Sequence, residues 1–131
     1  MMGGLYVEMA ALKTLGKWLT KSGWTSVLVQ AGIATPGKAD AMLPASHVTR
    51  TRYAHQVTAA ALYILKASAY QSYSNSDHGE SDTLDFQHWN DDQAMSHPQF
   101  KFWDTALQLA LTVLEYIQSI REDNFPLYVQ Q

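Results

Sequence analysis

Two charged residues fall on helix faces that are otherwise apolar. Helical wheels place Glu8 among leucines and Arg50 on the same side as Val57. An unpaired carboxylate is costly to remove from water, so a buried Glu8 requires a cation, a metal ion or a proton. We therefore expect a buried polar contact in which Glu8 meets Arg50, or the nearby His47, across two packed helices.

Glu8 allows two other interpretations. Either the start of its helix frays and leaves the carboxylate in water, or Glu8 is a catalytic or metal-binding group, because perturbed carboxylates cluster at functional sites. A second, weaker metal candidate is His88 with Asp91 or Asp92, about one helical turn away. The chain has no cysteine, no Gly-x-Ser-x-Gly elbow and no phosphate-binding glycine loop, so no catalytic residue and no cofactor is predicted.

A third group combines cations with aromatic rings on one long predicted helix. Its members fall within about a quarter of the helical wheel, and they are Arg52, His55, Tyr63, Lys66, Tyr70 and Tyr73. Surfaces that bind single-stranded nucleic acid interleave the same residue types. A solvated amphipathic face explains the group as well, since only two members carry a permanent charge. Nucleic acid is therefore one candidate partner.

Helical periodicity predicts the elements that position these groups. Apolar residues at three- and four-residue steps predict an N-terminal helix over about 5–21, and long helices over about 45–73 and 98–123. Residues 74–84 are rich in Ser, Asn, Asp and Gly and are expected to form a flexible loop. The sequence thus predicts an all-α fold, an irregular helical bundle that forms a single domain over 1–131.

Turn and capping signals divide the rest of the chain into short helices. Gly23 can take the left-handed conformation that ends the first helix. Thr35 precedes a proline and Asp85 precedes Phe86, so each offers a side-chain oxygen to cap a helix start. Shorter helices are therefore expected over 24–31, 36–43 and 86–95.

The predicted helix over 98–123 has more apolar surface than one neighbour can cover. Its polar residues occupy less than half of the wheel, as in helices that are surrounded by other elements. The expectation is a central core helix. Alternatively, the apolar face of residues 100–120 contacts another copy of the chain, another protein or missing flanking sequence, which makes the chain a helical protein-interaction or oligomerisation module.

Composition limits the classes of partner. The 131 residues carry a formal net charge of -3, which gives no general attraction to nucleic acid or to an anionic membrane. The most apolar stretch is interrupted by Gln108, Thr112 and Glu115, so no membrane span is predicted. The N-terminus has no secretory signal and the chain has no cysteine, so we expect an intracellular protein, with the nucleus as a candidate compartment.

Four segments carry a resemblance to a known family. They are GGLYVEM at 3–9, HVTRTR at 47–52, AHQVTAAALYIL at 54–65 and SIREDNFPLY at 119–128. The segments resemble blocks of a multicopy, uncharacterised animal protein family with the character of mobile-element, transposase-like reading frames. The resemblance covers most of the chain, and Tyr6 stands where the family pattern has histidine.

This resemblance implies a fragment of a longer protein. The chain would then be an internal, non-catalytic portion of a mobile-element-derived protein that supports nucleic-acid transactions or the assembly of a larger enzyme. The resemblance also implies, as an alternative, a metal-dependent nuclease-like site of the family in which Glu8 takes part. No other residue of this chain is assigned to that activity.

Overall fold

The computed structural model describes residues 3–76 and 84–123. The described residues form six helices and no strand, so the predicted all-α bundle is confirmed. The helices are α1 (Gly3–Leu19), α2 (Trp24–Gln30), α3 (Pro36–Met42), α4 (Val48–Ser74), α5 (Phe86–Ser96) and α6 (Pro98–Asp123). Most of the predicted flexible loop over 74–84 lies outside the described residues.

The predicted caps determine where the short helices begin. The Thr35 hydroxyl accepts a hydrogen bond from the Lys38 amide at 3.4 Å, and the Asp85 carboxylate accepts one from the His88 amide at 2.8 Å. The long helix α4 begins three residues later than expected. Ala45 has a φ of 57°, in the left-handed region, so the chain makes a turn before α4 starts.

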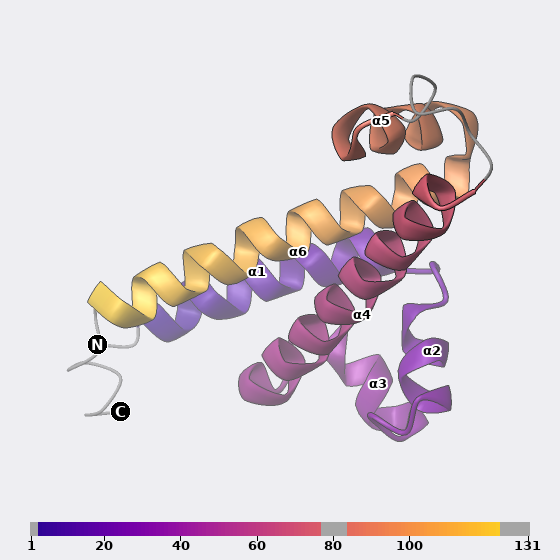
Figure 1. The fold of residues 1–131 in the computed structure, drawn as a ribbon. Coiled ribbons are helices and arrows are strands. Elements are labelled where there is room, and N and C mark those ends of the chain that lie inside the picture. Colours follow the sequence, from indigo (N-terminus) through magenta and orange to yellow (C-terminus); the bar gives the residue numbers. More distant parts are fainter. Residues whose placement is uncertain (1–2, 77–83, 124–131) are drawn as a thin grey trace.

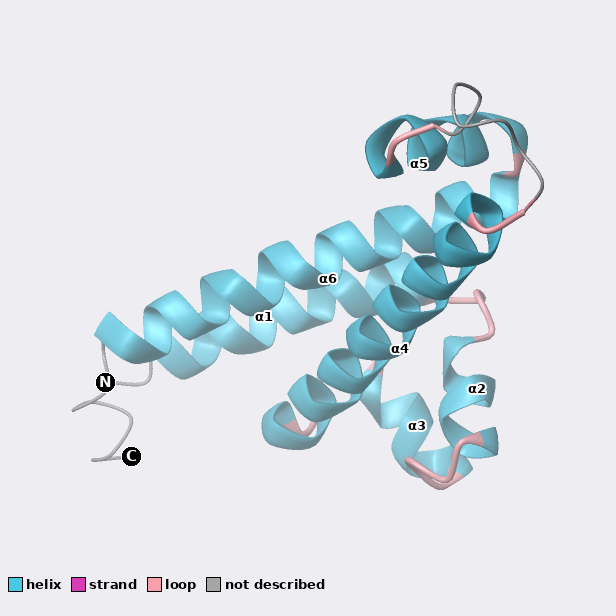
Figure 2. Ribbon diagram, viewed as in Figure 1, coloured by secondary structure: helices cyan, strands magenta, loops and turns pink. Residues whose placement is uncertain are grey.

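Helices α1 and α6 lie side by side in opposite directions, and α4 crosses them (Figure 1). Shared core clusters set the antiparallel register, pairing Leu12 with Ile117, Leu15 with Ala110 and Leu19 with Ala106. The short helices α2 and α3 pack together beside α4, and α5 covers the start of α6 (Figure 2). The core therefore follows α6, the helix that contacts α1, α4 and α5.

A glycine allows α1 to approach the turn after α3. Gly16 is buried, and a Cβ atom built on it would lie 1.8 Å from the backbone oxygen of Leu43. Any side chain at this position would force the backbone apart. Helical periodicity does not reveal this close contact, because it depends on a segment that is distant in the sequence.

The apolar face of α6 is largely used inside the chain. Ala106, Leu107, Ala110 and Ile117 are buried, as expected for a central core helix. Leu109, Leu111 and Tyr116 remain exposed. None of the described helices combines the length and the apolar character needed to cross a membrane.

Candidate functional site

Glu8 is completely buried and joins three helices. Its carboxylate forms an ion pair with Arg52, from the second turn of α4, and Nη1 of Arg121, from the last turn of α6, lies 3.4 Å from the other carboxylate oxygen. The side chain of Arg52 is 17% exposed and that of Arg121 is 42% exposed. The interpretation in which the first helix frays and Glu8 lies in water is therefore wrong.

Glu8 forms the predicted buried contact, but its partner is neither Arg50 nor His47. Arg50 and His47 are both exposed at the start of α4, and Arg52 takes the position that the prediction gave to Arg50. Residues two apart on a helix point about 200° apart, so Arg50 and Arg52 cannot both face α1. The wheel was misleading because several sides of α4 are apolar, and Val57 does not mark its buried face.

The residues proposed as a nucleic-acid face do not form one open surface. Arg52 is paired with Glu8, and the ammonium of Lys66 lies 2.6 Å from a carboxylate oxygen of Asp104. His55 is buried, whereas Tyr63 is exposed. The expected basic and aromatic face is therefore incorrect, because tertiary contacts neutralise its two permanent charges and remove its imidazole from water.

The remaining aromatic members of this group belong to a ring cluster at the other end of α4. Tyr70 meets Phe86 and Trp89 of α5 edge to face, with ring centroids 5.2 and 5.3 Å away. Its hydroxyl donates to the backbone oxygen of Leu84 at 2.9 Å. Tyr73 lies in the same cluster, with its ring 6.3 Å from that of Trp89. These tyrosines hold α5 against α4 and are not free stacking platforms.

His55 packs against α2 without a polar partner for one of its nitrogens. Its ring stacks on Trp24, with centroids 4.6 Å apart and planes inclined by 12°. The indole of Trp24 donates to the hydroxyl of Thr58 at 2.8 Å, but Nε2 of His55 and the hydroxyl of Thr51 have no hydrogen-bond partner among the residues that the structure describes. Desolvation by burial lowers the pKa of His55 to about 4, so the imidazole is neutral at pH 7.

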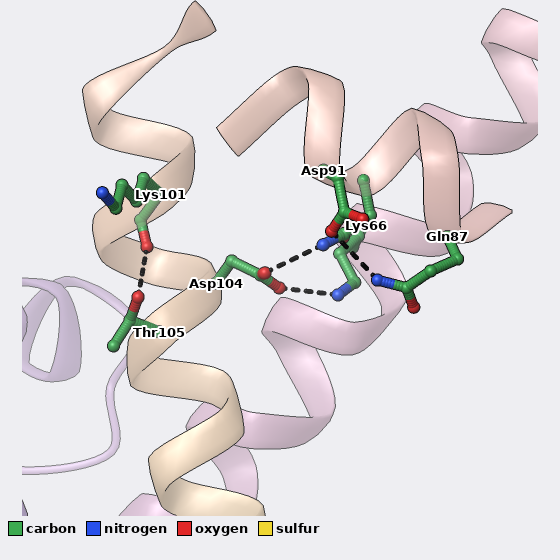
Figure 3. Close-up of polar contacts among 7 residues, drawn as sticks. Lys66, Gln87, Asp91, Lys101, Asp104 and Thr105 are labelled. Carbon is green, nitrogen blue, oxygen red and sulfur yellow. Dashed lines mark hydrogen bonds and ion pairs between the residues drawn. The ribbon is translucent and has the colours of Figure 1, made fainter. Parts of the chain in front are cut away.

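Figure 3 shows a second ion pair, between Lys66 of α4 and Asp104 of α6, which is partly buried and which α5 completes. Asp104 accepts from the Lys66 ammonium at 2.6 Å and from the side-chain amide of Asn90 at 3.0 Å. The Lys66 ammonium also lies 5.3 Å from the centre of the Phe86 ring, within cation–π range. The network is structural, because each charge is engaged by groups from neighbouring helices.

The candidate metal ligands do not come together. His88 contacts Asp85 at 2.9 Å, Asp91 accepts from Gln87 at 3.0 Å, and Asp92 is exposed. Two guanidinium groups occupy the positions beside Glu8 where a metal ion would have to bind. Within residues 3–76 and 84–123, no three His, Cys, Asp or Glu side chains are arranged to hold a metal ion.

A cleft of about 700 Å³ separates the first half of α4 from the last half of α6. Apolar side chains form most of its walls, and they are Ala59, Ala60, Tyr63, Ile64, Leu111, Leu114 and Ile117. Arg52 and Arg121 line the same cleft, so it adjoins the Glu8 cluster. This shape and lining suit an apolar binding partner with a polar group at one end.

The exposed edge of the cleft continues onto α4. Tyr63 and Ile64, which line the cleft, are 60% and 65% exposed, respectively. The sequence places both in a long helix but does not show that they face solvent. Arg121 was also missed as a member of the site, because its contact with Glu8 depends on the antiparallel packing of α6 against α1.

Comparisons with known proteins leave the family open. No family model matches the sequence, and no curated protein or solved structure is significantly similar to it. The resemblance to a mobile-element family therefore stays a prediction.

Proposed function

We propose that this chain is a helical protein-interaction module that binds an apolar segment of a partner in the cleft between α4 and α6. The exposure of Tyr63 and Ile64, which line that cleft, carries the proposal. Complete burial of one large apolar side chain is worth roughly 1.5–3 kcal/mol, so burial of these two side chains by a partner favours binding. Contiguous exposed apolar surface of this kind marks interaction sites.

The nucleic-acid role that the family resemblance implies has less support. Arg52 and Lys66 each face a carboxylate, and His55 is buried and neutral. Affinity for nucleic acid comes mainly from cations that are free to meet phosphates. Support for the assembly of a larger protein agrees better with the cleft, since assembly requires a docking surface.

A binding titration with a synthetic peptide tests the proposal. The probe is a 14-residue amphipathic helix with leucines on one face and glutamines elsewhere. We expect the wild-type chain to bind it and Ile64→Asp to bind it at least about tenfold more weakly, because a carboxylate in an apolar contact must be desolvated. Ile64 is exposed, so this variant keeps the fold.

Tyr53→Asp is the matched control. Tyr53 is 56% exposed on the same helix and does not line the cleft. Equal binding of the peptide by both variants, or no binding by the wild type, contradicts the proposal. Retention on DNA at low salt that disappears in the variant with Arg52→Ala and Lys66→Ala would favour the nucleic-acid role instead.

A further inference from the structure

A second pocket lies between α4 and α6, at the end of the pair that α5 covers. Its volume is about 310 Å³, and its walls come from residues 62–69 of α4 and 99–107 of α6. We call it the Trp103 pocket. Among the described residues, no side chain lines both this pocket and the cleft of the proposed function, so the two are separate sites.

The α4 wall of the Trp103 pocket is apolar. Leu62, Leu65 and Ala69 recur at steps of three and four residues, so they share one face of the helix. Leu65 is 66% exposed, whereas Leu107 on the opposite wall is 2% exposed. Leu65 therefore lies at the rim and Leu107 at the floor, and a ligand in the pocket would cover the exposed leucine.

Two aromatic rings line the α6 wall, and their neighbours hold them in place. Phe100 meets Trp89 of α5 edge to face, with ring centroids 5.7 Å apart. Trp103 meets Phe102 in the same geometry at 5.0 Å. Such packing restricts the rotation of both rings. The pocket is therefore largely preformed, as small-molecule sites usually are.

The charged groups of the lining neutralise each other. Among the described residues that line the pocket, these groups are Lys66 and Asp104, which pair at 2.6 Å. Asn90 donates to the same carboxylate at 3.0 Å, and the Phe86 ring lies 5.3 Å from the ammonium. A charged ligand would lose its hydration and find both charges already paired. The lining therefore favours an uncharged molecule.

The volume of the pocket sets the size of its ligand. A dry apolar cavity of about 150 Å³ binds benzene, and small-molecule pockets have volumes of roughly 300–1,000 Å³. At about 310 Å³, the Trp103 pocket matches a molecule of two fused rings. One turn of a partner helix, about 10–12 Å wide and 5.4 Å long, requires more room than this.

We propose that the Trp103 pocket is a binding site for a small, uncharged aromatic molecule of about two fused rings. The ligand packs between Leu62 and Leu65 on one side and the rings of Phe100 and Trp103 on the other. Offset and edge-to-face ring contacts favour an aromatic ligand over a saturated one of the same size. The exposed amide of Gln99, also in the lining, can hydrogen-bond one polar group of the ligand.

Four related compounds test the chemistry of the ligand. The main probe is 2-naphthol, and equilibrium dialysis at pH 7 measures its affinity for the wild-type chain. We expect the anion 2-naphthoate and the cation 2-naphthylmethylammonium each to bind at least about tenfold more weakly, because the lining has no net charge. The saturated decahydro-2-naphthol should bind about threefold more weakly, because it lacks the ring contacts.

Filling the pocket tests its location. Ala69→Trp places a large side chain in the Trp103 pocket, and we expect it to weaken the binding of 2-naphthol at least about tenfold. Ala60→Trp is the matched control, because Ala60 is another exposed alanine of α4 but lines the other cleft. It should leave 2-naphthol binding unchanged and weaken the binding of the leucine peptide. Circular dichroism checks both folds, and Gln99→Trp serves if Ala69→Trp is not folded.

The outcomes separate this inference from the proposed interaction function. The inference is overturned if 2-naphthol does not bind, if either ion or the saturated compound binds as tightly, or if binding survives in the filled variant. A dimer of the wild-type chain that excludes 2-naphthol shows that a second copy covers the pocket, and also overturns it. None of these results affects the peptide titration, which reports on the other cleft.

Discussion

The ring of His55 lies flat against the indole of Trp24, with 4.6 Å between their centroids, inside the contact of α4 with α2. Both residues are buried, and α2 itself carries no ionisable side chain. A histidine in such a place is tolerated as a neutral ring. Protonation of His55 would place a buried positive charge beside α2, which supplies no carboxylate to balance it. Because protonation therefore favours the unfolded chain, the stability of the fold depends on pH.

We expect the chain to lose stability in mild acid because of His55. Its folded-state pKa of about 4 lies below the ordinary 6.5, so the unfolded chain binds the proton more tightly. The stabilisation is complete above pH 6.5 and is lost as the pH falls through 6.5 toward 4. The free energy of unfolding should fall by roughly 3 kcal/mol over this window, at about 1.4 kcal/mol per pKa unit.

Urea unfolding followed by circular dichroism between pH 7 and pH 4 measures this effect. The variant His55→Phe keeps an aromatic ring against Trp24 and should lose most of the pH dependence in this window. His88→Gln is the control, because His88 is exposed. If wild type and His55→Phe decline in parallel, His55 is not the responsible group.

Removal of the Glu8 charge should destabilise the fold strongly. Glu8→Gln leaves the largely buried guanidinium of Arg52 without its counter-charge, which typically costs about 3–5 kcal/mol. Arg121→Gln should cost less than about 1 kcal/mol, because Arg121 is partly exposed. Urea unfolding compares the two, and similar losses would mean that Glu8 is not held mainly by Arg52.

Replacement of Gly16 should disrupt the contact of α1 with Leu43. Alanine favours a helix over glycine by about 1 kcal/mol, but its Cβ would overlap the Leu43 carbonyl oxygen. We expect Gly16→Ala to destabilise the chain by at least about 2 kcal/mol, at the upper part of the range for overpacking. Gly37→Ala, where a Cβ meets nothing within 4 Å, should be neutral or slightly stabilising. The melting temperatures of the two variants test these expected changes in stability.

The Lys66 and Asp104 pair should prove essential for the packing of α5. Asp104→Ala removes the counter-charge of Lys66 and the acceptor of the Asn90 amide, at an expected cost of roughly 2–4 kcal/mol. Asp91→Ala removes an exposed carboxylate that contacts Gln87 and should change stability by less than about 0.5 kcal/mol. Hydrogen exchange should show the loss of protection centred on α5, and equal protection in both variants would argue against this role.

Local signals in the sequence determined the helices. Apolar periodicity located α1 and α6 within two residues of their ends, and the side chains of Thr35 and Asp85 marked the starts of α3 and α5. These features depend on neighbours within one helical turn, so they can be read without a fold. The burial of Glu8 followed in the same way, because its place among leucines is a property of α1 alone.

Only the tertiary structure decided which groups meet. The helical wheel predicted Arg50 as the partner of Glu8 and assigned Arg52 to another face, whereas the crossing of α4 over α1 selects Arg52. The antiparallel packing of α6 brings Arg121 to the same carboxylate, and the divergence of α4 from α6 leaves Ile64 exposed beside a cleft. Such pairings join residues 44 to 113 positions apart, and no local periodicity encodes the angle at which two helices cross.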